Sequence, residues 1–201
     1  MDYRAVLERI IEQVDSTAYL TPSAQVDPRH RTVLQSIGSM IQDRSISADA
    51  IRQHIETQFE AGRLDRVHYL SARHVLAASP RVQDWGEAAR LAGEQELAAL
   101  DQGGPYLQTN LAAVDRHRGV VAYLRGHYDV ALDHFSRALE RQRSAENLGN
   151  VLCALVRLGE LPEARSLYAQ IASTLPRPLV DELTQMVNQD PDLAVLRQEA
   201  P

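Results

Sequence analysis

Histidine and cysteine are the residues of this chain best suited to metal binding or acid–base chemistry. The sequence holds seven histidines and one cysteine. His68 and His74 are six residues apart, so they do not share a helical face, and a turn is expected between His127 and His134. No His-Glu-x-x-His or Glu-x-x-His pattern occurs in the sequence. The spacing therefore predicts no metal site.

The single cysteine, Cys153, lies in an apolar run from Val151 to Leu155, where a small buried thiol is expected. A catalytic thiol would need a base and an electropositive setting, which the neighbouring residues do not supply. All 21 basic residues are arginines, a composition typical of a GC-rich bacterial genome. Without lysine, the chain cannot form a Schiff base or a P-loop. We therefore expect no enzymatic activity and no cofactor.

The overall composition is that of a folded protein. Of the 201 residues, 44% are apolar and 24% are charged, and the net charge of −6 argues against broad binding to nucleic acid or anionic membranes. No run approaches the roughly 20 apolar residues of a membrane-spanning helix. The N-terminus lacks the apolar core of a signal peptide, so we expect a cytoplasmic protein without membrane insertion.

The segment from Asn110 to Arg143 has the clearest internal pattern. Gly126 is suited to a turn between two helices because it tolerates positive φ. After it, Ala131, Phe135 and Ala138 recur at i, i+4 and i+7, which places them on one helical face. The segment is therefore expected to form a helical hairpin.

The same pattern occurs on both sides of this hairpin. After 33 residues, Gly159 repeats the turn glycine, and Pro162 falls in the first turn of the next helix, where its missing N–H costs nothing. Upstream, a more divergent copy aligns Trp85 with Tyr128. Its second helix is expected to be longer, from about Gly86 to Leu100.

The pattern Gly-x-Tyr-x-x-Ala-x-x-x-Phe-x-x-Ala-Leu, found at Gly126 to Leu139, resembles the tetratricopeptide repeat (TPR). The resemblance implies an all-α, right-handed solenoid of helical hairpins that stack because each hairpin buries its apolar face against a neighbour. The expected organisation is an N-terminal helical region, 1–64, TPR-like repeats over 65–176 (about 67–100, 110–143 and 144–176), and a C-terminal capping helix and tail, 177–201.

Three further helices are expected before the repeats, at Tyr3–Val14, Pro28–Asp43 and Ser47–Ala61, with a loop over Asp15–Asp27. Their pattern leaves open whether they form a separate domain or begin the solenoid. After Pro176, apolar residues at helical spacing predict a capping helix. A short final turn follows, for which Asp190 is the expected N-cap and Pro191 the first helical residue.

The TPR resemblance also implies that defined positions of each first helix line a concave groove. These positions are Arg73, His74, Arg116, His117, Tyr123, Asn150 and Arg157. Arginines beside hydrogen-bonding residues suit the carboxylates of an extended peptide or a free C-terminus. The alternative is a solvated arginine face. The two-carboxylate clamp of the family is not reproduced. Replacing both Arg73 and Arg116 with glutamate is expected to abolish partner binding and to leave helicity and the melting temperature nearly unchanged.

The sequence therefore predicts a non-enzymatic adaptor or scaffold that binds a partner protein or peptide. The alternative is a transcriptional regulator with a TPR-like sensor domain, because the segment from Ser45 to Leu64 resembles a helix-turn-helix recognition helix with Arg52, Gln53 and His54 toward a major groove. Asp49 and Glu56 on the same helix count against nucleic-acid binding. The partner and the oligomeric state are left open.

Overall fold

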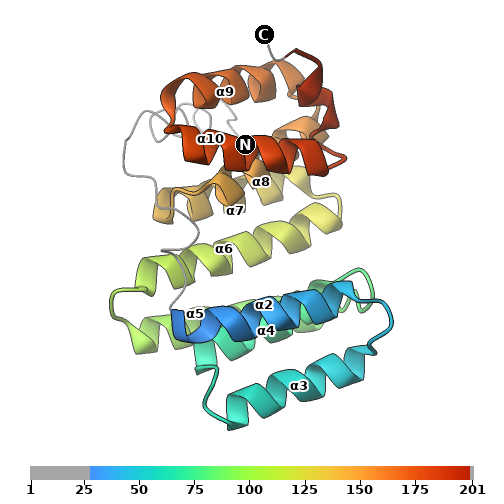
Figure 1. Ribbon diagram of the computed structural model, residues 1–201, viewed down its shortest axis with the longest axis vertical. Helices are drawn as coiled ribbons and strands as arrows, with labels where there is room; N and C mark the ends of the chain where they lie inside the picture. The colour runs from blue at the N-terminus through green and yellow to red at the C-terminus, as the bar shows by residue number, and fades with distance from the viewer. Residues whose placement is uncertain (1–27, 200–201) are drawn as a thin grey trace. The chain divides into compact units, whose positions relative to one another are not determined.

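The computed structural model describes residues 28–199, and their regular structure is entirely helical (Figure 1). Over these residues there are nine α-helices, one short 3-10 helix (η2) and no β-strand. The predicted all-α class is therefore confirmed for the described residues. The predicted helix Tyr3–Val14 and the loop Asp15–Asp27 lie outside them.

The described residues belong to two compact units. The N-terminal unit covers residues 28–121, and the C-terminal unit covers residues 122–199. The division falls inside helix α6 (Leu107–Leu124). The domain limits expected at residues 64 and 176 follow repeat boundaries, and they remain predictions.

The N-terminal unit begins with four helices, α2 (Pro28–Gln42), α3 (Ala48–Glu60), α4 (Arg66–Ala78) and α5 (Trp85–Gln102). Figure 1 shows α2 and α3 as antiparallel neighbours joined by a short turn. Both helices contact α4, and α4 in turn packs along α5. Helices α2 and α3, which precede the expected repeats, thus belong to the same compact unit as α4 and α5.

Short polar side chains begin three of these helices. The side chains of Ser47, Asp65 and Asp84 each accept a hydrogen bond from the backbone N–H of the residue three positions later, at 2.9 to 3.1 Å. Such N-caps satisfy donors that have no partner inside the helix. The helices predicted at Pro28–Asp43 and Ser47–Ala61 are confirmed, with ends that differ by one residue.

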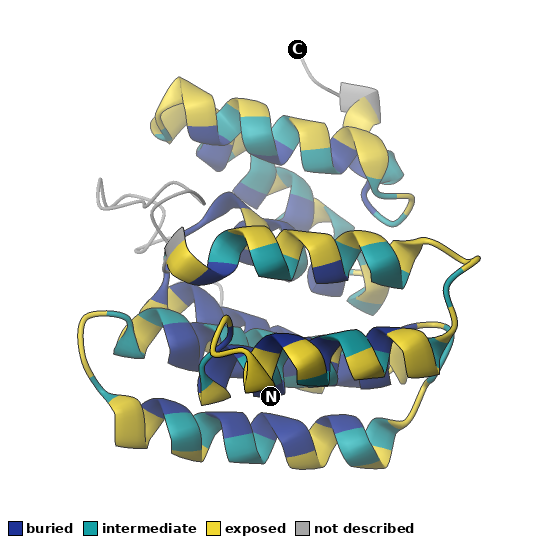
Figure 2. Ribbon diagram, turned by 60° about the horizontal axis from the view of Figure 1, so that its bottom comes forward, coloured by how far each residue is buried: buried dark blue, intermediate teal, exposed yellow. Residues whose placement is uncertain are grey.

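Two groups of buried apolar residues form most of the core of the N-terminal unit (Figure 2). The first joins α2, α3 and α4 and consists of Ile37, Ile51, Ile55, Leu64, Ala72 and Leu76. The second joins α4, α5 and α6 and consists of Leu70, Ala77, Ala78, Ala88, Leu91 and Val121. Alanines at the contact of α4 with α5 allow these two helices to approach closely.

The C-terminal unit contains α7 (Tyr128–Arg141), α8 (Ala145–Leu158), α9 (Leu161–Thr174), α10 (Arg177–Gln189) and η2 (Ala194–Glu199). Helix α8 is the centre of this unit, because it contacts α7, α9 and α10. At Gly149, a Cβ atom would lie only 2.7 Å from the Met186 Cε atom, so the Met186 side chain of α10 packs directly on the backbone of α8 at this glycine.

The predicted turns of the C-terminal unit are confirmed. Gly126 and Gly159 have φ angles of 78° and 86°, in the left-handed region that glycine tolerates best. Pro162 lies in the first turn of α9, as expected. The Asn147 side chain donates to the carbonyl oxygens of Ala138 and Gln142 at 3.2 and 2.7 Å, which satisfies acceptors at the end of α7.

The final turn differs from its prediction. The Asp190 carboxylate accepts the backbone N–H of Asp192 at 2.8 Å, which forms a local turn instead of capping a helix at Pro191. The Arg197 guanidinium donates to the carbonyl oxygens of Val187 and Asp190, so it closes the end of α10. The 3-10 helix therefore begins only at Ala194.

None of the helices in residues 28–199 has the combination of length and hydropathy needed to cross a membrane.

Replacing Ala131 with leucine is expected to destabilise the chain by about 1–3 kcal/mol, because the Ala131 side chain is fully buried in α7 and a larger one has no space. Urea unfolding followed by circular dichroism would measure the loss. The matched control is Val130→Leu on the next residue, which is 42% exposed. Equal stability of the two variants would contradict the packing at Ala131.

Candidate functional site

Four side chains of the C-terminal unit meet at one end of α8, and we call them the Arg157 cluster: Tyr123, Tyr128, Arg157 and Asp192. Tyr123 donates a hydrogen bond to the Asp192 carboxylate, and Arg157 donates one to the Tyr128 hydroxyl. The Arg157 guanidinium also lies 3.5 Å from Asp192 Oδ1 and 4.9 Å from the centre of the Tyr128 ring. The cluster thus joins the ends of α6 and α8, the start of α7 and the turn before η2.

The Arg157 cluster borders an open groove with a volume of about 630 Å³. The groove is lined by Val156, Arg157, Gly159, Leu161, Pro191, Asp192, Ala194 and Val195. Most of these residues are apolar, and 46% of the Arg157 side chain is exposed. A mainly apolar groove with a few polar groups is the usual form of a ligand site.

Ionisable groups around this groove are held in their protonated forms. Burial, together with the hydrogen bond to Asp192, raises the pKa of Tyr123 above its usual range. Burial and the charges of Asp190 and Asp192 raise the pKa of the Cys153 thiol to about 12. The predicted burial of Cys153 is confirmed, and a thiol with this pKa is a poor nucleophile at neutral pH.

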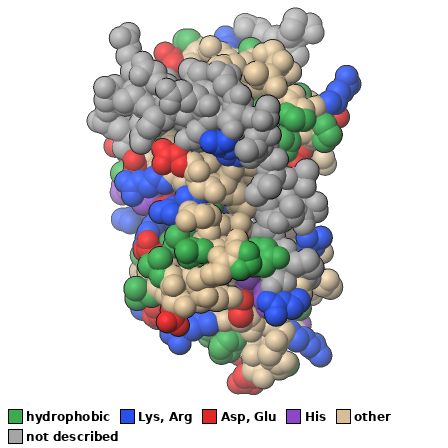
Figure 3. Space-filling model, turned by 90° about the vertical axis from the view of Figure 1, so that its left-hand side faces the viewer, with side chains coloured by type: hydrophobic (Ala, Val, Ile, Leu, Met, Phe, Trp, Pro, Cys, Tyr) green, Lys and Arg blue, Asp and Glu red, His purple; other side chains and the backbone are tan. Residues whose placement is uncertain are grey.

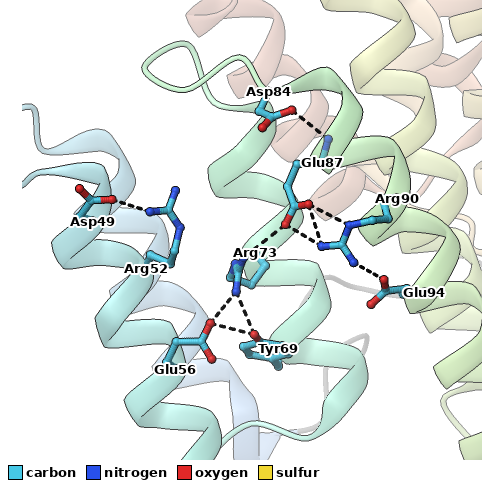
Figure 4. A network of polar contacts seen from close by, with 9 residues as sticks. All are labelled: Asp49, Arg52, Glu56, Tyr69, Arg73, Asp84, Glu87, Arg90 and Glu94. Carbon is cyan, nitrogen blue, oxygen red and sulfur yellow. Dashed lines mark hydrogen bonds and ion pairs between the residues drawn. The ribbon is translucent and has the colours of Figure 1, made fainter.

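Arg73 is held by carboxylates of its own unit (Figure 4). Its guanidinium lies 2.5 Å from Glu56 Oε1 and 3.2 Å from Glu87 Oε1, and it also donates to the Tyr69 hydroxyl at 2.9 Å. Only 19% of the Arg73 side chain is exposed. A glutamate at position 73 would place a third carboxylate beside Glu56 and Glu87, so these contacts favour a loss of stability in place of the nearly unchanged melting temperature expected from the sequence.

His74 and His117 stack inside the N-terminal unit instead of facing solvent. Their ring centres are 4.2 Å apart with an angle of 14° between the planes, and the two residues are 1% and 6% exposed. His74 Nδ1 lies 2.8 Å from the Ala88 carbonyl oxygen, and His117 Nδ1 lies 2.9 Å from Gln95 Oε1. The sequence placed these imidazoles on an exposed binding face, but the structure buries both of them.

Arg116 and Asn150, the remaining predicted contacts, are half-buried.

On the face shown in Figure 3, arginine and acidic side chains are interspersed and histidine contributes only small areas. Within the segment compared with a recognition helix, Arg52 forms an ion pair with Asp49 of the same helix. The charge expected to contact DNA is therefore balanced locally.

The sequence did not indicate the partners that complete the Arg157 cluster. Asp192 and Tyr128 lie far from Arg157 along the chain, and only the fold brings them together.

One group in the described residues could hold a metal ion, namely His30, Asp65 and His68 of the N-terminal unit.

No protein-family model matches this chain, and neither a curated protein nor a solved structure is significantly similar to it.

Replacing Arg73 with methionine is expected to lower the free energy of unfolding by about 1–2 kcal/mol, because Glu56 and Glu87 lose a partly buried cation. Chemical denaturation would measure the loss. Arg90→Met is the matched control, since the Arg90 side chain is 52% exposed at the edge of the same network. If the Arg73 variant is as stable as the Arg90 variant, the network does not stabilise the fold.

The buried histidine pair predicts that stability falls with acidification. Burial and the nearby charges of His74 and Arg116 hold the pKa of His117 well below its usual value, and burial also lowers the pKa of His74. The unfolded chain therefore binds more protons below about pH 6.5, so the free energy of unfolding is fully present above that pH and decreases below it. For each histidine, the free energy of unfolding falls by at most about 1.4 kcal/mol per pH unit.

The measurement is urea unfolding between pH 7 and pH 5, roughly the range in which an unperturbed histidine titrates. His117→Gln should flatten the dependence, whereas His127→Gln, at an exposed position, should leave it unchanged. A wild-type slope that persists in His117→Gln would show that other groups cause it.

Proposed function

We propose that this chain is a non-enzymatic protein-binding module built of TPR-like helical hairpins, and that its C-terminal unit binds a short peptide segment of a partner protein. The order of contacts supports the TPR-like arrangement. Within the units, α4 packs on α5 and α8 on α9, and α8 also contacts α7 and α10. Glycine turns separate the helices of the hairpins at Gly126 and Gly159.

The observation that carries the proposal is the position of Arg157 in the wall of the 630 Å³ groove. A guanidinium has five N–H donors. In Arg157, one terminal nitrogen contacts Asp192 and the other donates to Tyr128, so these contacts use two of the five donors. The separation of 3.5 Å from Asp192 is longer than the 2.7–2.9 Å typical of a charge-assisted hydrogen bond. Arg157 therefore retains donors for a second carboxylate.

The surroundings of Arg157 suggest the kind of segment that would bind. The stacking of Arg157 on Tyr128 orients the guanidinium, which reduces the conformational entropy lost on binding. Val156, Leu161 and Val195 supply apolar walls beside it. The groove thus suits an extended segment in which a carboxylate, from a side chain or a free C-terminus, lies next to apolar residues.

A catalytic role for the same site is less well supported. Tyr123 and Cys153 are the nearby groups that a nucleophilic mechanism would use, and both have raised pKa values. The Tyr123 hydroxyl is also committed to Asp192 by a hydrogen bond. Binding needs only the geometry and the charge that the groove has.

Selection from a displayed library of random peptides would test the proposal with the full chain. We expect enriched peptides to combine a carboxylate with apolar neighbours. The dissociation constant of the best peptide, measured by isothermal titration calorimetry, should rise about tenfold or more in Arg157→Glu.

The control is Arg177→Glu, which makes the same charge change at a side chain that is 90% exposed. Its affinity should stay within about twofold of the wild type. The proposal fails if no peptide is enriched over scrambled sequences, or if the selected peptide binds Arg157→Glu as tightly as the wild type.

A further inference from the structure

Three potential metal ligands meet in the N-terminal unit, away from the Arg157 cluster of the other unit. His30 comes from the first turn of α2, Asp65 directly precedes α4, and His68 lies in the first turn of α4. One ligand atom of each lies within 4.8 Å of the other two. His30 and His68 are only 6% and 9% exposed, so the two imidazoles are shielded from water, whereas 27% of the Asp65 side chain is exposed.

The imidazole of His30 has one nitrogen with a clear partner and one without. Its Nδ1 atom lies 3.0 Å from the Arg63 carbonyl oxygen, and because a carbonyl only accepts, Nδ1 carries the proton of this hydrogen bond. In the neutral ring, Nε2 then has a lone pair. Nε2 lies 3.2 Å from Asp65 Oδ2 without the alignment of a hydrogen bond, and it has no hydrogen-bond partner among the described residues.

A buried lone pair beside a carboxylate oxygen is unfavourable unless a positive charge lies between them. A backbone carbonyl that fixes the other ring nitrogen is also the usual outer contact of a metal-ligating histidine. The orientation of His30 by Arg63 is therefore the arrangement expected if Nε2 binds a cation.

Asp65 and His68 complete the group. His68 Nδ1 lies 2.7 Å from Asp65 Oδ1, and Gln102 donates to Asp65 Oδ2 at 3.2 Å. An aspartate carboxyl is ordinarily ionised at neutral pH, so Asp65 offers an anionic ligand, and its role as N-cap of α4 fixes its position.

We propose that His30 Nε2, the Asp65 carboxylate and His68 Nδ1 bind a divalent transition-metal ion, for which Zn²⁺ is the best match. Two imidazoles and a carboxylate are typical zinc ligands, at about 2.0–2.2 Å from the ion. At these lengths, neighbouring ligands of a tetrahedral ion are about 3.3 Å apart. His30 Nε2 lies 3.2 Å from Asp65 Oδ2, whereas His68 Nδ1 lies 2.7 Å from the other carboxylate oxygen, Oδ1. The side chains would therefore adjust to place both nitrogens and one oxygen around the ion, which replaces the proton between His68 and Asp65.

The consequence of binding is a link between α2 and the start of α4. With three protein ligands, the ion keeps a fourth position for water or an exogenous ligand. Because the ligands come together only in the folded chain, the free energy of binding also stabilises the fold. This inference concerns the N-terminal unit and does not depend on the proposed peptide groove.

The test uses the full chain after treatment with a chelator and Zn²⁺ as the probe. Titration calorimetry should show about one tight site per chain, and Zn²⁺ should raise the melting temperature. With Co²⁺ in place of Zn²⁺, the visible absorption should show a four-coordinate ion. His30→Ala should weaken binding by more than the 10–100-fold typical of losing an outer-shell partner.

Two further variants separate metal binding from folding. Asp65→Asn keeps an oxygen that can cap α4 but removes the anionic ligand, so it should fold and lose the tight site. His127→Ala, at an exposed histidine outside the group, should bind Zn²⁺ like the wild type. The proposal is overturned if the wild type has no stoichiometric site, or if the site persists in both His30→Ala and Asp65→Asn.

Discussion

The burial of apolar helix faces against neighbouring helices of the same unit is the interaction on which this structure depends. Helix α8 shows it most clearly, because its buried residues face α7, α9 and α10. Burial at about 25 cal/mol per Å² of apolar surface is the dominant stabilising contribution in such an arrangement. Small residues lie at such contacts: Ala131 is fully buried, and the Met186 side chain packs against Gly149.

Close packing also explains why several polar residues serve the fold. A buried polar group without a partner costs about 1–3 kcal/mol, so it is placed where the interior supplies one. Asn147 satisfies carbonyls at the end of α7, and His74 and His117 reach Ala88 and Gln95. Arg73 is likewise held between carboxylates of α3 and α5.

The two proposed sites use different chemistry in different units. The groove beside Arg157 combines an exposed guanidinium with apolar walls, which suits an anionic, partly apolar segment. The group of His30, Asp65 and His68 combines two buried imidazoles with one carboxylate, which suits a small cation. Each site lies near helix ends, where residues from separate segments of the chain meet.

The sequence by itself determined the helices and their turns. Apolar spacing, caps such as Ser47 and turn residues such as Gly126 act over a few residues, so the helical class of the described chain and most helix limits followed from local signals. The tertiary structure decided which side chains meet. The pairing of Tyr123 with Asp192, and of His30 with Asp65, joins residues that are distant along the chain. Burial of His74 and His117 was equally hidden, because a periodic pattern marks a helical face but not the neighbour that covers it.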